Sequence, residues 1–319
     1  MTTNDHTRRR VLKSTGAVLG AAVLGSTPAA AGNHEKWTVE ETPTGNTLYG
    51  VNYTTDGAYA VGAGGVVIRR TSEGWKKVLD GGPTGNGNSL YGSDVINDGS
   101  VLWFAGSSGA IGEYDVESGV LDDHSAPNDV TNNFNDINVR GEQGSANVYV
   151  AGDSGKIYYS FEDGETGTWD SVTPGSGSNI NALDFFDARS GHAVDGNKTV
   201  FVTDDGSTYD KLGIADANNN FYGVDSDGFD DVTVVGGGGT VFEWDGSEWV
   251  RTDLGDASLR DVEVDDDEAY TVGGGGKVFR RSGGTWSQED TPTGENLKAV
   301  VDGDPAIAVG AGGTVIARK

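Results

Sequence analysis

Residues 152–155, with the sequence Gly-Asp-Ser-Gly, are the stretch of this chain whose residue types come nearest to a catalytic motif. A serine in this setting can act as a nucleophile when a histidine takes up its proton, and His124 and His192 are the histidines closest to it in the sequence. The same stretch, however, is one copy of a glycine-rich turn that recurs along the chain. We therefore interpret it as turn geometry and expect no catalytic residue. In that register Ser154 is equivalent to Ala63, Ser108, Gly238 and Gly312.

Oxygen-bearing side chains recur at the fifth position of a short strand pattern that repeats along the chain. In a closed ring of repeats they could gather near one mouth of a central channel and attract a hard cation. Asp and Asn also begin turns, and we favour that interpretation. Residues 225–228 contain only a fragment of a calcium-binding loop, and 4 His with 0 Cys leave no transition-metal site, so no metal and no cofactor is expected. The polar residues are Asn52, Asp94, Asn138, Asp184, Asp225 and Glu263, with Val301 as the exception.

Basic residues cluster in three of the repeats although the chain has a net charge of −27. Arginine pairs well with carboxylates through its planar fork, so the cluster is a candidate docking surface for an acidic partner. The alternative is that these residues only neutralise neighbours such as Glu73, Asp80 and Glu289, and the sequence leaves both open. The candidate partner-binding residues are Arg69, Arg70, Lys76, Lys77, Arg280, Arg281, Arg318 and Lys319.

All of these residues occur within copies of one repeated sequence motif. "AVGAGGVVI" from Ala60 recurs as "VVGGGGTVF" from Val234 and "AVGAGGTVI" from Ala308, with less regular copies between them. Seven copies occur at intervals of roughly forty residues, which is the length of a propeller blade. The residues that lead the seven turns are Gly62, Gly106, Gly152, Asp195, Gly236, Gly273 and Gly310.

Each repeat is predicted to form four short strands. The first has the form apolar, any residue, small residue or Asp, apolar, as in "LYGV" at 48–51. The second and third flank the glycine turn, whose residues suit a tight hairpin. The fourth begins at an aromatic residue such as Trp75, but the second repeat lacks it. Because helical periodicity is missing, we predict an all-β fold, a seven-bladed β-propeller of four-stranded blades.

A duplication near the two ends of the chain predicts how the ring closes. "KWTVEETPTGNT" at 36–47 aligns with "TWSQEDTPTGEN" at 285–296, and the last repeat, from Leu297, has room for only three strands. We therefore expect residues 36–47 to supply the fourth strand of the last blade, with Trp37 as its aromatic residue. Such closure removes two open sheet edges.

The first 31 residues have the form of an export signal. A basic cluster, "TRRRVLK", precedes a short apolar stretch and then three alanines at 29–31, and the cluster is similar to the twin-arginine motif. We expect 1–31 to be a signal peptide and 32–319 to be a single propeller. Such a high acidic charge is tolerated best where salt screens it, and the composition is similar to that of proteins from salt-loving archaea.

Over residues 36–319 the repeats resemble the BNR-type repeats of the photosystem II stability and assembly factor group. The resemblance rests on "AVGAGGVVIRRTSEGWKKV" and its recurrence, and on shortened Asp-box turns before Trp75, Tyr209 and Trp286. It implies a seven-bladed propeller that binds other proteins and helps to assemble or stabilise a complex.

These features together favour a secreted, non-enzymatic propeller that acts as an interaction, assembly or stability factor at the cell surface. We expect protein partners in the cell envelope, a monomer, and no integral membrane segment in the mature chain. Nucleic acid is excluded by the charge. The alternative is a glycan-binding or glycan-cleaving propeller, in which two carboxylates would act as a pair. The Arg-Ile-Pro phrase of sialidases is absent from the chain.

Overall fold

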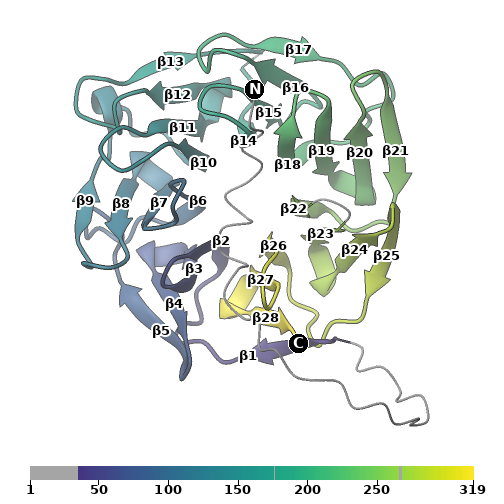
Figure 1. The fold of residues 1–319 in the computed structure, drawn as a ribbon, viewed down its shortest axis with the longest axis horizontal. Helices are drawn as coiled ribbons and strands as arrows, with labels where there is room; N and C mark the ends of the chain where they lie inside the picture. Colours follow the sequence, from purple (N-terminus) through teal and green to yellow (C-terminus); the bar gives the residue numbers. More distant parts are fainter. Residues whose placement is uncertain (1–34, 176, 266–267) are drawn as a thin grey trace, which may run out of the picture.

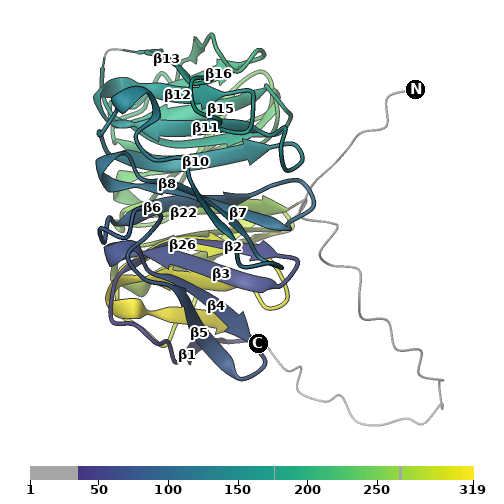
Figure 2. The same cartoon turned by 90° about the vertical axis from the view of Figure 1, so that its left-hand side faces the viewer.

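Seven four-stranded antiparallel sheets stand in a ring around a central channel (Figure 1). The computed structural model describes residues 35–175, 177–265 and 268–319, so the predicted signal peptide lies outside the described residues. The side view in Figure 2 shows the sheets stacked like the blades of a propeller. The prediction of a seven-bladed β-propeller is confirmed.

The blades take the following strands, each in order from the channel outwards. Blade 1 contains β2 (Leu48–Thr54), β3 (Gly57–Gly62), β4 (Val67–Thr71) and β5 (Gly74–Leu79). Blade 2 contains β6 (Leu90–Val95), β7 (Val101–Gly106), β8 (Ile111–Asp115) and β9 (Leu121–Asp123). Blade 3 contains β10 (Phe134–Arg140), β11 (Asn147–Gly152), β12 (Ile157–Ser160) and β13 (Asp170–Val172). Blade 4 contains β14 (Ile180–Phe185), β15 (Gly191–Asp195), β16 (Val200–Thr203) and β17 (Asp210–Leu212).

The remaining blades follow the same order. Blade 5 contains β18 (Phe221–Gly228), β19 (Asp231–Gly236), β20 (Thr240–Trp244) and β21 (Trp249–Asp253). Blade 6 contains β22 (Leu259–Asp265), β23 (Glu268–Gly273), β24 (Val278–Ser282) and β25 (Thr285–Glu289). Blade 7 contains β26 (Leu297–Val301), β27 (Ile307–Gly310), β28 (Val315–Arg318) and, outermost, β1 (Trp37–Glu40). Blade 2 does have a fourth strand, the short β9, which begins at Leu121 and not at an aromatic residue.

The chain closes its ring as the duplicated TPTG phrase predicts. β1 pairs antiparallel with β28, with Trp37 opposite Arg318 and Glu40 opposite Val315. Trp37 is only 4% exposed. Figure 1 shows β1, from the start of the chain, lying beside β28 at its end. Blade 7 therefore has no open outer edge at β28.

Single 3-10 turns join the second and third strands in six blades and define what we call the glycine-turn face. At Gly65 the backbone has φ +70° and an added Cβ would lie 2.2 Å from the backbone nitrogen of Gly82, so only glycine fits. The turns are η1 (Ala63–Gly65), η2 (Ser107–Gly109), η4 (Asp153–Gly155), η5 (Gly237–Gly239), η6 (Gly274–Gly276) and η7 (Ala311–Gly313), while η3 (Pro127–Asp129) follows β9.

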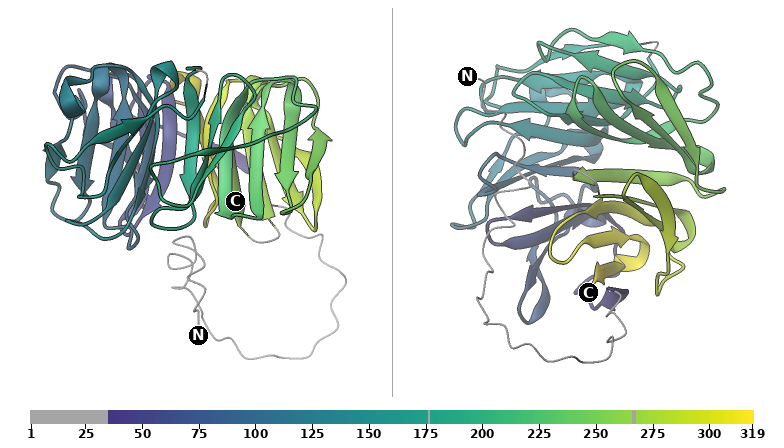
Figure 3. Two further views of the ribbon diagram at one scale, coloured as in Figure 1. Left: turned by 90° about the horizontal axis from the view of Figure 1, so that it is seen from above. Right: turned by 45° about the vertical axis from the view of Figure 1, so that its right-hand side comes forward.

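The hydrophobic core lies between neighbouring blades. Leu48, Ile68 and Trp75 of blade 1 pack against Ile307 and Val315 of blade 7, and all five side chains are buried. Equivalent clusters join other neighbouring blades, so each blade depends on the next for the burial of its apolar face. Figure 3 shows the ring of blades from two further sides. None of the described segments contains a helix long and apolar enough to cross a membrane.

Candidate functional site at the mouth of the central channel

Each of the seven innermost strands carries a bulge at its second residue. In β2, for example, Leu48 pairs with Gly62 and Gly50 with Val61, so Tyr49 has no partner in the ladder. A bulge bends the strand and re-aims the side chain of the extra residue, and bulges are frequent beside functional sites. We call the seven bulged residues the bulge ring. They are Tyr49, Tyr91, Asn135, Asn181, Tyr222, Arg260 and Lys298.

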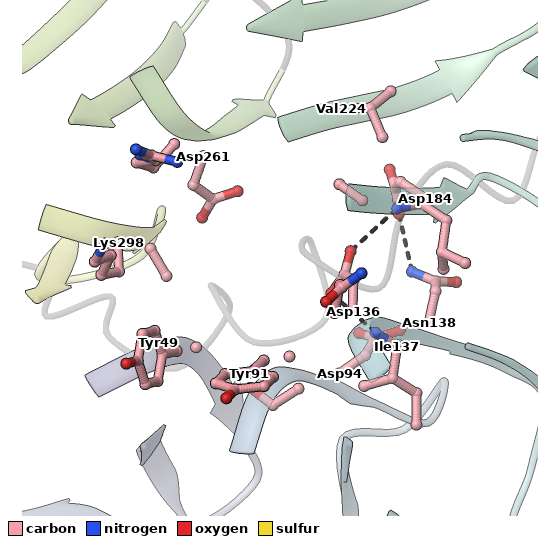
Figure 4. Close-up of a pocket in the computed structure, with 18 of the residues that line it drawn as sticks. Tyr49, Tyr91, Asp94, Asp136, Ile137, Asn138, Asp184, Val224, Asp261 and Lys298 are labelled. Atoms are coloured by element: carbon pink, nitrogen blue, oxygen red, sulfur yellow. Dashed lines mark hydrogen bonds between the residues drawn. The ribbon is translucent and has the colours of Figure 1, made fainter. Parts of the chain in front are cut away.

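All seven residues of the bulge ring line one cavity in the channel (Figure 4). The cavity encloses about 800 Å³ of space that protein atoms do not fill, part of it open to solvent. The innermost strands begin next to the glycine turns, because Leu48 pairs with the residue that directly precedes η1. The bulge ring therefore lies at the mouth of the channel on the glycine-turn face.

Tyrosines occupy three places in the bulge ring. Tyr49 and Tyr91 meet edge to face with ring centroids 5.2 Å apart. Burial, followed by the neighbouring Tyr91, raises the pKa of Tyr49, so its hydroxyl stays protonated at neutral pH and can donate a hydrogen bond. The guanidinium of Arg260 stacks over Tyr222 at 4.3 Å from the ring centroid, which fixes the arginine by a cation–π contact.

Two cations on neighbouring blades, Arg260 and Lys298, complete one side of the ring. Neither forms a salt bridge with a carboxylate of residues 35–175, 177–265 or 268–319. Burial, and after it the nearby Arg260, lowers the pKa of the Lys298 amine. In contrast, Arg140 approaches Asp94 at 3.5 Å and Asp184 at 3.2 Å. Arg260 and Lys298 are thus not engaged in an ion pair among the described residues.

Two asparagines, on blades 3 and 4, provide acceptors on another side of the ring. Asn135 donates its amide to the backbone oxygen of Ile180 at 2.9 Å, and Asn181 donates to that of Phe221 at 2.6 Å. Their amide oxygens accept no hydrogen bond from the part of the chain that the structure describes. The mouth therefore has donors on blades 6 and 7 and acceptors on blades 3 and 4.

Below the bulge ring, an aspartate on each of blades 2 to 6 links its blade to the next one along the chain. Asp94, Asp184 and Asp225 lie inside strands, so our expectation that they begin turns is wrong. They line the cavity, as the channel hypothesis predicted, but each accepts a backbone N–H from the next blade. The links run from Val139 to Asp94 (2.8 Å), Leu183 to Asp136 (3.1 Å), Ser226 to Asp184 (2.8 Å), Val264 to Asp225 (3.1 Å) and Val300 to Asp261 (2.8 Å).

The surroundings of Asp136 shift its pKa. Burial raises the pKa of Asp136 well above its usual value, while hydrogen bonds from the amides of Leu183 and Ile137 oppose that rise. A Cβ on Gly92 would lie 2.6 Å from this carboxylate, which explains the small residue on the preceding blade. Asn52, Asn138 and Glu263 line the same cavity, where Asn138 donates to Asp184 at 3.0 Å. In the described ranges no three His, Asp or Glu residues are grouped as a metal ion would require.

The Gly-Asp-Ser-Gly stretch consists of the last residue of β11, Gly152, and the three residues of η4. Ser154 adopts φ +62° and its backbone N–H donates to Asn179 Oδ1 at 3.0 Å. Its equivalent in blade 1 is Gly64 and not Ala63, because Gly64 has the corresponding left-handed conformation in η1. The two histidines bind elsewhere: His124 lies 3.1 Å from Glu113, and His192 lies 2.7 Å from Ser226. Neither His124 nor His192 is thus in place to activate Ser154.

The basic cluster lies at the ends of the third strands and the starts of the fourth, and Glu40 pairs with two of its members, Arg70 and Lys319. This carboxylate, at the end of β1, accepts two hydrogen bonds from Arg70, at 2.9 and 2.8 Å, and one from Trp75 at 2.8 Å. Lys319 lies 2.6 Å from it. The hydrogen bond from Arg70 is the largest influence that lowers the pKa of Glu40 to about 2. These contacts clamp blade 7 to blade 1.

A second clamp of the same design joins blades 6 and 7. Glu289 accepts hydrogen bonds from Arg318 at 3.1 Å and from Trp37 at 2.6 Å. The other members of the basic cluster also have carboxylate partners in the same chain. They pair as Arg69 with Asp56, Lys76 with Glu73 (2.5 Å), Lys77 with Asp80 (3.0 Å), Arg280 with Glu268 and Arg281 with Glu243. This pairing supports charge neutralisation, and docking of a partner to the cluster stays a prediction.

The bulge ring could not be predicted from the strand pattern, because the pattern leaves the residue at this position unspecified. The strand pattern "apolar, any, small or Asp, apolar" puts the bulged residue at "any". Variation at one position of an otherwise regular repeat is itself a signal, since framework positions are constrained by packing and ligand-facing ones are not.

Comparison with known proteins supports the fold. No protein-family model and no curated protein matches this chain. Among solved structures, "YCF48 bound to D1 peptide" superposes with a TM-score of 0.70 at 15% identity, covering 92% of this chain and 99% of that one. YCF48 from Cyanidioschyzon merolae gives 0.68 at 15% identity, with 89% and 98% covered. A catalytically inactive virginiamycin B lyase from Staphylococcus aureus, with quinupristin, gives 0.77 at 13% identity, with 90% and 99% covered. At these identities the likeness shows the fold alone.

Proposed function

We propose that this propeller is a non-enzymatic protein-binding factor that holds its partner against the bulge ring on the glycine-turn face. The observation that carries the proposal is the pair Arg260 and Lys298, which line the channel mouth without a carboxylate partner among the described residues. Half-buried tyrosines beside them offer the rigid amphipathic surface that protein contacts favour. An assembly or stability role at the cell surface, reached by export, is part of the same proposal.

Protein binding is supported by two of the structural neighbours. YCF48 was solved with a D1 peptide, and another neighbour of similar fold belongs to the mitotic checkpoint complex, with a TM-score of 0.70 at 12% identity. We propose that the present chain uses the same fold for a similar purpose. The carboxylates of the channel support a non-enzymatic role, because Asp94, Asp136 and Asp261 accept backbone hydrogen bonds that hold the ring together.

Partner capture with matched variants tests the proposal. The immobilised chain is incubated with cell-envelope extract in molar KCl, and bound proteins are identified by mass spectrometry. We expect Tyr91→Ala with Tyr222→Ala to lose the bound protein, and Tyr159→Ala, on the third strand of blade 3, to keep it. Melting curves show that the variants fold.

Other outcomes redirect or refute the proposal. Equal recovery by the ring variant places binding elsewhere, and loss with Lys76→Gln and Lys77→Gln would then identify the basic cluster. Recovery of glycan in place of protein would establish the glycan-binding alternative.

A further inference from the structure

We propose that Arg260 and Lys298 bind one carboxylate of a peptide, whose amide N–H groups face Asn135 and Asn181 across the channel mouth. This inference deepens the proposed function and rests on it. The two cations come from adjacent blades at the same bulge position, so they face one volume. Figure 4 shows Lys298, Tyr49 and Tyr91 following one another around the channel wall.

Arg260 and Lys298 differ from the arginines of the basic cluster, because neither has a carboxylate partner among the described residues. The net charge is −27, and the arginines of the basic cluster are all paired with carboxylates. Arg260 instead stacks on Tyr222, and Lys298 is destabilised as a cation by burial and by Arg260. Two like charges that lie together in a partly buried site repel each other and are poorly solvated, and a bound anion offsets this unfavourable energy.

The donors and acceptors of the mouth fit a carboxylate that belongs to a peptide. A guanidinium matches a planar carboxylate with two parallel hydrogen bonds. Across the mouth, Asn135 and Asn181 each donate an amide N–H to a backbone oxygen, of Ile180 and Phe221, and their amide oxygens accept no hydrogen bond from the described residues, so these oxygens can accept N–H groups from a ligand.

The aspartates below the ring restrict the ligand further. Asp184 and Asp225 lie in the channel below the ring, where each accepts a backbone N–H from the next blade, and Asp184 also has Arg140 at 3.2 Å. A polyanion would meet this negative field, whereas a single carboxylate can stay at the rim on Arg260 and Lys298. The site therefore suits one carboxylate on a largely neutral segment, either a chain terminus or an acidic side chain.

Three pools of short random peptides test the proposal and identify the source of the carboxylate. The first has free C-termini and no Asp or Glu, the second has amidated C-termini with Asp and Glu, and the third is amidated without them. Retention is measured on the immobilised full chain at one KCl concentration. We expect the first or second pool to be retained on the order of tenfold better than the third, since a hydrogen bond to a charged group contributes about that factor.

Variants assign the effect to the two cations. Arg260→Gln with Lys298→Gln should abolish the preference, and Arg260→Lys should weaken it because the charge remains and the fork is lost. Arg251→Gln with Lys211→Gln makes the same change in net charge on the outermost strands and should leave retention unchanged. Melting curves check folding, and the comparison of pools on the native chain does not depend on any variant.

The proposal is overturned if the third pool is retained as well as the other two, if no pool is retained above blank resin, or if the double variant keeps the preference. A first pool that exceeds the second identifies a chain terminus, and the reverse identifies a side chain. If an envelope protein is captured through Tyr91 and Tyr222 but is unaffected by Arg260→Gln with Lys298→Gln, only this inference fails. If no envelope protein is captured at all, the proposed function fails.

Discussion

Replacement of Glu40 by Gln is expected to destabilise the propeller strongly, because this carboxylate clamps the two blades at the closure. Its side chain is 12% exposed and lies against Arg70, Trp75 and Lys319. These contacts lower its pKa from 4.5 to about 2. Since each pKa unit corresponds to 1.36 kcal/mol, the clamp contributes about 3 kcal/mol to the free energy of unfolding.

The stabilisation by Glu40 should depend on pH. A carboxyl whose pKa is lower in the folded state stabilises the fold above its unfolded value of 4.5, and that contribution disappears as the pH falls through about 2. Glu40→Gln should therefore lower the free energy of unfolding by about 3 kcal/mol at pH 7. The difference from the native chain should shrink toward zero between pH 5 and pH 2.

Urea unfolding followed by tryptophan fluorescence, at a series of pH values and fixed KCl, measures this difference. The matched control is Glu73→Gln, an exposed carboxylate that pairs with Lys76 alone, which should leave the midpoint unchanged at every pH. A loss for Glu40→Gln that is the same at pH 7 and pH 2, or no larger than that of the control, would refute the electrostatic clamp.

Three further predictions follow from closure, charge and the first residues of the chain. Trp37→Ala should cost about 3 kcal/mol or more, because this side chain is 4% exposed and packs at the closing strand; an unchanged melting temperature would contradict closure by β1. The chain should unfold cooperatively in molar KCl and lose cooperativity in dilute buffer, because its net charge of −27 is then unscreened; equal calorimetric transitions in both buffers would disprove this. Export should leave a mature N-terminus near Gly32, which intact-mass measurement on secreted protein checks, and replacement of Arg8 and Arg9 by Lys should keep the chain inside the cell.

The repeats and the closure could be predicted from sequence because they depend on local patterns. The glycine turns recur at nearly constant spacing, and the TPTG phrase occurs both before β2 and before β26. Contacts between blades could not be predicted in the same way. Asp136, for example, pairs with the amide of Leu183 on the next blade, and nothing in its own repeat indicates that partner.

The partners in the two clamps between blades could not be predicted from the sequence either. Glu40 and Glu289 each stand three residues after a tryptophan, a pattern visible in the sequence, but the arginine that each one binds belongs to the following blade. Blade 5 has Thr252 at the equivalent position. Arg281 accordingly pairs with Glu243, and the indole N–H of Trp286 has no hydrogen-bond partner among the described residues.

The most direct test of the bulge ring as the binding site is hydroxyl-radical footprinting of the chain with and without the captured partner. Tyrosine side chains react readily, and three of them lie in the bulge ring. Our account predicts that the partner lowers the oxidation of Tyr49, Tyr91 and Tyr222, while Tyr159, on a third strand, reacts as before. Unchanged oxidation of the three ring tyrosines in the complex would contradict the account.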